Sequence, residues 1–217
     1  SVDVLVIGSS AAGLVAATTA RNANPDKSIT VLRKEEKTLV PCGIPYIFDS
    51  IQTTENNLMP SGKMFEQAGI DLVISEVVSI DRKEKSCSLK NGERIGYTKL
   101  VLATGSNPTV PSWLKGTRLE NVFTVPKDKV YLDAMQEKLK GQKRVIVIGG
   151  GFIGVELSDE LKKSGKEVTL VEKLPHILAL AFDEDIAVRI EALLTGRGVV
   201  LKTGIGAQEI VGDTKVN

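Results

Sequence analysis

The stretch Val145-Ile146-Val147-Ile148-Gly149-Gly150-Gly151-Phe152-Ile153-Gly154 decides the fold. Its four β-branched apolar residues predict a buried strand, and Gly149, Gly151 and Gly154 then follow with the spacing GxGxxG. In such a loop the first glycine permits a tight turn, the second lets a phosphate approach the backbone, and the third lets a helix pack on the strand. The start of the helix predicted over residues 152–164 offers free N–H groups and partial positive charge. The stretch therefore predicts a turn that binds the pyrophosphate of a dinucleotide.

An acidic residue at the end of the next predicted strand, residues 168–171, supports this interpretation. Glu172 stands where a carboxylate accepts hydrogen bonds from an adenosine ribose and repels a 2′-phosphate, which favours NADH over NADPH. Lys173 beside it weakens that preference. The alternative is a glycine-rich turn without a ligand, but the order strand, glycines, helix, strand and acid favours the nucleotide site.

A less regular copy of the same pattern opens the chain. Residues 2–7 predict a strand and residues 11–23 a helix. The loop between them has Ser10 at the place of the middle glycine, where its hydroxyl could contact phosphate. The loop consists of Gly8, Ser9, Ser10, Ala11, Ala12 and Gly13. A turn without a ligand stays open here as an alternative.

The end of the second predicted strand, residues 28–32, departs from the pattern. Arg33, followed by Lys34, occupies the place where an acid normally binds ribose. Glu35 or Glu36 could supply the carboxylate from the following loop, although spacing alone does not show it.

The remaining segments complete two units of one kind. Short strands are expected over residues 70–102, with a hairpin turn at Asn91-Gly92 between residues 87–89 and 94–97 and a separate apolar segment at 100–103. Residues 107–126 contain three prolines that predict a connection. Helices and strands then alternate again, with helices at 127–140, 152–164 and 184–194 and strands at 144–148, 168–171 and 199–201. We expect an α/β fold of two Rossmann-like three-layer units, with a small antiparallel β segment in the first. The expected boundaries are residues 1–107, a connection at 108–125, and residues 126–217.

Composition excludes several other classes of protein. The chain has 217 residues, 42% of them apolar and 25% charged, which is typical of a soluble globular protein. A net charge of +1 provides no positive electrostatic field to attract nucleic acid or an anionic membrane, and 4% aromatic residues provide no surface on which bases could stack. We therefore expect no nucleic-acid and no membrane partner. Two cysteines and no export signal predict a cytoplasmic setting without a structural disulfide. No metal site is predicted.

On these motifs the chain resembles the flavin-dependent pyridine nucleotide–disulfide oxidoreductases over nearly its whole length. The segment from Tyr97 to Ser106 belongs to the resemblance, which implies that the first unit binds FAD and the second NAD(P)H. Ala103-Thr104-Gly105 would then lie against FAD, Phe152 could cover the flavin, and Glu156 would lie near the nicotinamide. For the last two, helix packing and an exposed carboxylate are the alternatives. The cofactor-binding residues that the resemblance implies are Gly8, Ser9, Ser10, Ala11, Ala12, Gly13, Arg33, Lys34, Pro41, Val77, Ala103, Thr104, Gly105, Gly149, Gly151, Phe152, Ile153, Gly154, Glu156, Glu172 and Lys173.

The spacing around Cys42 indicates which branch of that family the chain resembles. Members with a redox disulfide carry two cysteines spaced CxxxxC, but Ile47 stands five residues after Cys42. Cys87 falls in a predicted hairpin and is expected to be a strand residue with no catalytic role. Pro41-Cys42-Gly43-Ile44-Pro45-Tyr46 is similar to the loop of coenzyme A-disulfide reductases. The resemblance implies that Cys42 is the catalytic residue, a thiolate that alternates with a sulfenic acid or a mixed disulfide. We expect it at the start of a helix to about residue 50, which would stabilise the thiolate. An inert buried thiol is the alternative.

The expected function is FAD-dependent NAD(P)H oxidation with reduction of coenzyme A disulfide at Cys42. An NADH oxidase or peroxidase that uses a Cys42 sulfenic acid is the alternative. It is less favoured because the histidine usual in the first loop of those enzymes is replaced by Ala11, and the single histidine, His176, is expected on the surface.

The length of the chain leaves a further alternative. Family members are longer, and they add a C-terminal FAD segment and a dimerisation domain that nothing after Val200 resembles. We therefore expect a truncated chain with an incomplete second unit, which could be an inactive nucleotide-binding fragment. Residues 204–217 are expected to begin further strands of that unit. The full-length protein is expected to be a homodimer.

Overall fold

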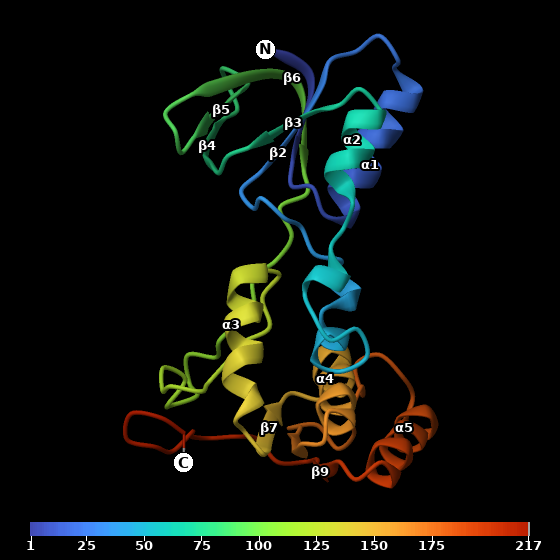
Figure 1. Ribbon diagram of the computed structural model, residues 1–217, viewed down its shortest axis with the longest axis vertical. Coiled ribbons are helices and arrows are strands. Elements are labelled where there is room, and N and C mark those ends of the chain that lie inside the picture. Colours follow the sequence, from blue (N-terminus) through green and yellow to red (C-terminus); the bar gives the residue numbers. More distant parts are fainter. Residues whose placement is uncertain (217) are drawn as a thin grey trace. The chain divides into compact units, whose positions relative to one another are not determined.

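The computed structural model describes residues 1–216, which form two compact units (Figure 1). The first unit contains Ser1–Pro41, Leu58–Asn107 and Lys127–Lys129. The second contains Cys42–Asn57, Pro108–Pro126 and the chain from Val130 onward. The units differ from the boundaries expected from the sequence at three places. Cys42–Asn57 packs with the second unit although it is flanked in sequence by the first, Pro108–Pro126 belongs to the second unit, and Lys127–Lys129 belongs to the first.

The first unit is built on a six-stranded sheet in the order β3-β2-β1-β6-β5-β4. Its first four strands in that order are parallel, and the last two form an antiparallel hairpin with one end of β6. The sequence predicted two segments where the structure has the single strand β6, whose ends pair with different neighbours. The strands are β1 (Val2–Ile7), β2 (Ile29–Arg33), β3 (Asp71–Ile74), β4 (Val77–Asp81), β5 (Ser86–Leu89) and β6 (Arg94–Leu102).

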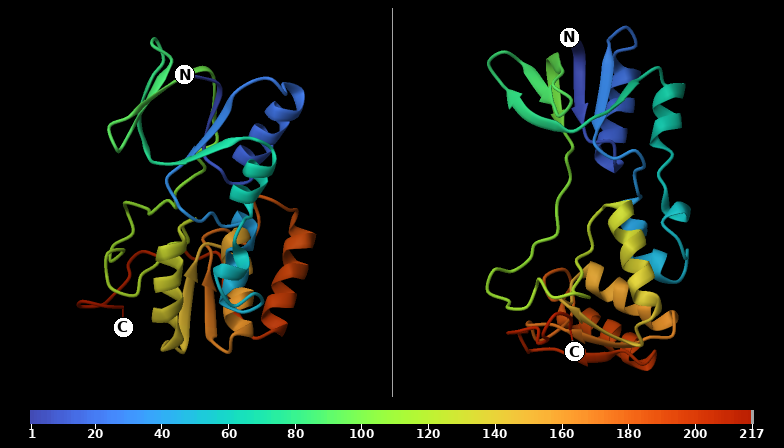
Figure 2. Two further views of the ribbon diagram at one scale, coloured as in Figure 1. Left: turned by 45° about the horizontal axis from the view of Figure 1, so that its top comes forward. Right: turned by 60° about the vertical axis from the view of Figure 1, so that its left-hand side comes forward.

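The alternating side chains of β1 explain the three layers of this unit. Val6 points to a core shared with α1 (Ala11–Ala23) and α2 (Ser61–Gln67), where Ala17 and Phe65 are fully buried. Leu5 points to the opposite face, where Cys87 and Leu89 of the hairpin close a second core. Helices therefore cover one face of the parallel sheet and the hairpin covers the other, as the right-hand view of Figure 2 shows.

The second unit repeats the strand–helix alternation around a parallel sheet in the order β7-β8-β9. Helix α4 packs on β7 and β8, and α5 packs on β9. The predicted α/β fold class is confirmed by this architecture. The elements are α3 (Lys129–Lys140), β7 (Arg144–Ile148), α4 (Phe152–Lys163), β8 (Glu167–Val171), α5 (Glu184–Gly196) and β9 (Val200–Lys202). Among the described residues, no helix is both long enough and apolar enough to cross a membrane.

The helix expected from Cys42 to about residue 50 is wrong. The structure has two short 3-10 segments, η1 (Pro41–Gly43) and η2 (Pro45–Phe48), followed by η3 (Glu55–Asn57). Pro45 explains the difference, because it has no N–H to donate to the carbonyl of Pro41 and its ring would clash with that carbonyl in a continuous α-helix.

The further strands expected after residue 203 are also not formed as regular strands. Residues in this segment make isolated bridges instead, which pair Glu209 with Lys115 and Lys215 with Glu120. The segment therefore lies along the connection at 108–126, whose backbone supplies its pairing partners. The prediction for Asn217 lies outside the described residues.

Candidate functional site

Three segments of the first unit meet at one edge of its sheet. Ile7 at the end of β1 pairs with Leu32 in β2 and with Leu102 in β6. The loop that starts at Gly8, the residues after Leu32 and the segment after Leu102 therefore leave the sheet side by side. In open α/β sheets this carboxyl edge, where the chain turns to opposite neighbours, is where ligands bind.

Two glycines of the first loop are dictated by backbone packing. Gly8 has a φ of +105°, and a Cβ on it would lie 2.1 Å from the carbonyl oxygen of Ala103. A Cβ on Gly13 would lie 1.9 Å from the carbonyl oxygen of Gly8. No larger residue fits either place without moving the backbone. The first glycine loop and the Ala103 segment are thus in direct backbone contact.

The space at the start of α1 suits a phosphate group. Ser10 is the N-cap of α1, and its buried hydroxyl has no hydrogen-bond partner within residues 1–216. Ala11 and Ala12 are exposed and form the first turn, whose N–H groups have no partner in the helix. A buried hydroxyl without a partner is costly unless a ligand satisfies it, so these residues fit the pyrophosphate of a dinucleotide.

Arg33 ties together the loops at this edge of the sheet. Its Nη1 donates to Thr38 Oγ1 and Ser61 Oγ at 3.1 Å, and its Nη2 donates to the carbonyl of Glu36 at 2.6 Å. Ser9 Oγ lies 3.1 Å from Thr38 Oγ1 in the same network. Burial lowers the pKa of Arg33 from its ordinary value. The cation therefore braces the glycine loop, which explains how an arginine can stand where an acid was expected.

The other residues assigned to the first cofactor lie in different surroundings. Lys34 is exposed, with its Nζ 3.6 Å from Glu35. Thr104 and Gly105 are exposed beyond β6, whereas Val77 packs in the core between sheet and hairpin. Pro41 begins η1 and is partly buried.

In the glycine loop of the second unit, one glycine is required for packing and another faces open space. Gly149 has a φ of +109°, and a Cβ on Gly154 would lie 1.9 Å from the carbonyl oxygen of Gly149. A Cβ on Gly151, the N-cap of α4, would have no atom within 4 Å. Gly154 is thus needed for packing, whereas the space over Gly151 is open to a ligand.

Glu172 lies against this loop, because Ile148 and Val171 are partners at the ends of β7 and β8. Its Oε2 accepts from Gly150 N at 2.5 Å and its Oε1 from Leu174 N at 2.7 Å. The carboxylate is therefore held by two backbone N–H groups beside the loop. Lys173, the next residue, is exposed.

The first turn of α4 carries exposed apolar side chains. Phe152 is 54% exposed, and its ring meets Phe182 edge to face at 5.7 Å between centroids. Ile153 is exposed beside it. Glu156, one turn further, is partly buried, and burial raises its pKa. Sequence reasoning missed Phe182, since no spacing rule connects it with Phe152.

Cys42 is an exposed free thiol in η1, and Cys87 is a buried free thiol in β5. The next residue, Gly43, is packed so tightly that a Cβ on it would lie 1.9 Å from Asn57 Oδ1. The alternative of an inert buried thiol therefore does not describe Cys42, whereas it describes Cys87.

The different surroundings of the two thiols lead to a testable prediction. Burial raises the pKa of Cys87, so at neutral pH it stays protonated and shielded in the folded chain. We expect iodoacetamide to label Cys42 within minutes and Cys87 only after unfolding, as measured by mass spectrometry of tryptic peptides. The variant Cys87→Ser should be labelled like the wild type, and rapid labelling of Cys42→Ser in the folded state would contradict the assignment.

His176, which was expected on the surface, is partly exposed and lies beside two glutamates of α5. Its side chain is 27% exposed, with Nδ1 3.3 Å from Glu191 and Nε2 3.6 Å from Glu184. The sequence did not indicate this pairing, which α5 creates by bringing both glutamates to the segment after β8. Within residues 1–216, no three His, Cys, Asp or Glu side chains gather so that they could hold a metal ion.

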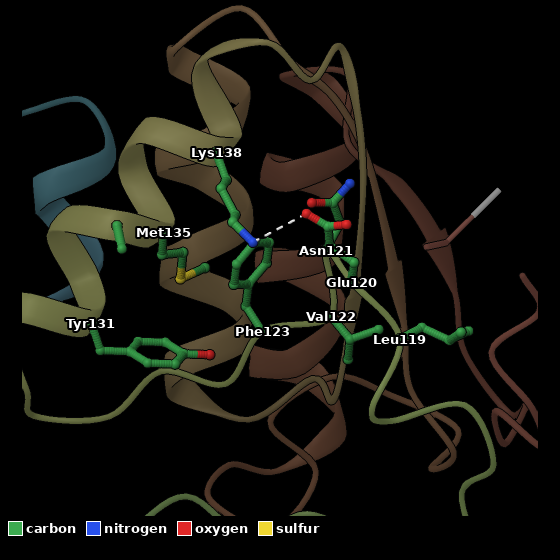
Figure 3. Close-up of a pocket in the computed structure, with 9 residues that line it drawn as sticks. Leu119, Glu120, Asn121, Val122, Phe123, Tyr131, Met135 and Lys138 are labelled. Atoms are coloured by element: carbon green, nitrogen blue, oxygen red, sulfur yellow. Dashed lines mark hydrogen bonds and ion pairs between the residues drawn. The ribbon is translucent and has the colours of Figure 1, made fainter. Parts of the chain in front are cut away.

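A pocket of about 290 Å³ lies between α3 and residues 119–123 (Figure 3). Phe123, Tyr131 and Met135 line it, and Lys138 pairs with Glu120 at 3.4 Å across one side. It contains none of the residues that the sequence assigned to a cofactor or to catalysis.

Two glycine turns, each at the carboxyl edge of a parallel sheet and followed by a helix, define the class of dinucleotide-binding α/β folds. The chain belongs to the pyridine nucleotide-disulphide oxidoreductase family, whose sequence profile matches residues 2–217. Enzymes of this family use FAD with NAD(P)H, in agreement with the predicted cofactors.

Individual relatives cover the chain almost completely. It is 33% identical to an NADH oxidase of Methanocaldococcus jannaschii over 98% of its length and 49% of the relative. It is 34% identical to an NAD(P)H sulfur oxidoreductase (CoA-dependent) of Pyrococcus abyssi over 88% of the chain and 44% of the relative. The structure of an NAD-dependent persulfide reductase from A. fulgidus superposes with a TM-score of 0.85 at 31% identity, over 98% of this chain and 41% of that one. The chain therefore spans about half the length of these relatives.

Proposed function

We propose that this chain binds FAD in its first unit and NADH in its second, and that it serves an enzyme that reduces coenzyme A disulfide through Cys42. The observation that carries the proposal is the exposed, free Cys42 in the segment Pro41 to Tyr46. A buried thiol could not meet a bulky disulfide, and a paired one could not act as a nucleophile.

The residues around each glycine turn support the two cofactor assignments. In the first unit, the Ser10 hydroxyl and the start of α1 would hold the FAD pyrophosphate, next to the Ala103 segment. In the second, Gly151 would lie under the pyrophosphate of the nicotinamide nucleotide. The carboxylate of Glu172 favours NADH, because it would repel the 2′-phosphate of NADPH at the loop that it contacts.

Because Cys42 has no second cysteine beside it, its reaction with a disulfide would form a mixed disulfide with the substrate. The Cys42 thiolate attacks one sulfur of coenzyme A disulfide, the S–S bond breaks, and the first coenzyme A leaves as a thiol after it takes up a proton. Cys42 is then joined to the second coenzyme A as a mixed disulfide. FAD and NADH, when bound, supply the two electrons that reduce this bond. Release of the second thiol regenerates the Cys42 thiolate, so one NADH yields two thiols.

Turnover measurements test this proposal against NADH oxidation by oxygen, the activity named for the M. jannaschii relative. The protein that carries this chain, saturated with FAD, would be given NADH with coenzyme A disulfide under argon. In separate assays it would be given NADH with oxygen or with hydrogen peroxide. Faster turnover with the disulfide, with two thiols released per NADH, supports the proposal. Turnover with oxygen or peroxide alone would overturn it in favour of an oxidase or peroxidase. Failure to bind FAD would leave a nucleotide-binding chain without this activity.

The assembly of the complete enzyme is a separate proposal. The relatives extend beyond the part that this chain matches, and from the family resemblance we propose that the complete enzyme works as a homodimer. Sedimentation of the protein that carries the chain would test this, and a monomer at micromolar concentration with full activity would contradict it.

A further inference from the structure

The segment that carries Cys42 is anchored to the second unit by side chains from two helices. In this segment, Cys42–Asn57, η2 packs along α4, and Ile47 is fully buried. Gln136 of α3 donates from Nε2 to the carbonyl of Ile47 at 2.8 Å and to that of Gln52 at 2.9 Å. Thr54, which is 1% exposed, donates its hydroxyl to Asp133 of the same helix.

The anchor supplied by α4 is a buried carboxylate. Glu160 is 1% exposed and contacts Ser50 with both of its oxygens. Its Oε2 accepts from Ser50 N at 2.8 Å, and its Oε1 accepts from Ser50 Oγ at 2.8 Å. Lys163 Nζ donates to the same Oε1 at 2.7 Å. A charged acceptor with this many donors makes stronger hydrogen bonds than a neutral one would.

Burial of a charge lowers the stability of the fold unless the charge is fully paired, so a buried carboxylate needs hydrogen-bond or ion-pair partners. Burial opposes ionisation of Glu160, but the hydrogen bonds from Lys163 and Ser50 outweigh it and hold the pKa below its ordinary value. Lys163 lies between two acids of α4, 2.7 Å from Glu160 and 2.9 Å from Asp159. Of these two acids, Glu160 is the one that also accepts both hydrogen bonds from Ser50, and it therefore links the lysine pair to the segment.

We propose that Glu160 is a positioning residue for Cys42, which it acts on through Ser50 by holding the segment Cys42–Asn57 on α4. The helix that begins at the Gly149–Gly154 loop would then carry the cysteine segment with it. The inference deepens the proposed function, because it gives the reactive sulfur a fixed place relative to the nucleotide loop of the same unit.

A spin label on Cys42 tests the inference without cofactors or turnover. Cys42 of the 217-residue chain would be joined to a nitroxide by a disulfide, while Cys87, shielded in β5, stays unlabelled. In Glu160→Ala we expect a mobile component in the electron paramagnetic resonance spectrum that the wild type lacks. Hydrogen exchange should also be about tenfold or more faster at the Ser50 amide, because a hydrogen bond to a charged group is lost. Both effects should be confined to Cys42–Asn57.

Matched variants make the outcome decisive. Asp159→Asn removes the neighbouring acid of α4, which contacts Lys163 and Arg197 but no residue of the segment in the bonds described above, so label mobility should not change. Glu160→Gln keeps an acceptor for the Ser50 amide and should restore most of the rigid spectrum. If Glu160→Ala does not fold, Glu160→Leu fills the buried space without an acceptor for either Ser50 bond and decides in the same way. An unchanged label spectrum in a folded Glu160→Ala or Glu160→Leu variant would overturn the inference, whether or not Cys42 proves catalytic.

Discussion

Replacement of Cys42 by serine is expected to lower the rate of coenzyme A disulfide reduction by about a thousandfold or more, because removal of a catalytic nucleophile usually costs at least that much. A serine hydroxyl stays protonated at neutral pH and does not attack a disulfide sulfur. NADH oxidation by an artificial electron acceptor such as ferricyanide should persist, since that route does not need the thiol. The measurement is steady-state NADH consumption with each acceptor, on protein saturated with FAD.

The other cysteine supplies the control. Cys87 lies in the core between hairpin and sheet, so Cys87→Ser should leave both rates within about twofold and affect stability instead, as expected for a buried packing position. Disulfide reduction that survives in Cys42→Ser would show that the sulfur chemistry takes place elsewhere. Loss of both activities in that variant would point to a damaged flavin site.

The second large effect is expected at Gly154. In Gly154→Ala the new Cβ would lie 1.9 Å from the carbonyl oxygen of Gly149, so α4 and the end of β7 must move apart. Overpacking of this kind costs about 1–3 kcal/mol of stability. NADH affinity should fall at least about tenfold, because the turn and the helix start are displaced together. Thermal unfolding and titration with NADH would measure the two effects.

Gly151 provides a contrast within the same loop. Its Cβ position is empty and its backbone is extended, so Gly151→Ala should leave the unfolding temperature nearly unchanged. NADH affinity should nevertheless fall, because the methyl group would occupy the space proposed for the pyrophosphate. Equal NADH affinity in Gly151→Ala and the wild type would contradict that placement.

Local patterns in the sequence were sufficient to predict most of the fold. Three signals each depend on only a few neighbouring residues: the apolar run before Gly149, the glycine spacing after it, and Asn91-Gly92. The structure has the strand, the turn and the hairpin that they predict. The helix predicted after Cys42 is not formed, because Pro45 lacks the N–H of a continuous helix and divides the segment into two 3-10 turns. The two segments expected in place of β6 were mispredicted because one strand pairs with different neighbours along its length.

The sequence by itself determined the α/β class, the two glycine turns and the choice of Cys42 as the candidate cysteine, because these depend on residue type and short spacing. Only the tertiary structure decided that Arg33 braces the first loop, that Phe182 meets Phe152, and that Ser50 bonds to Glu160. Each of these contacts joins residues that lie far apart in sequence or whose direction depends on the loop around them. The assignment of Cys42–Asn57 to the second unit has the same cause, since packing on α4 rather than position in the chain holds that segment.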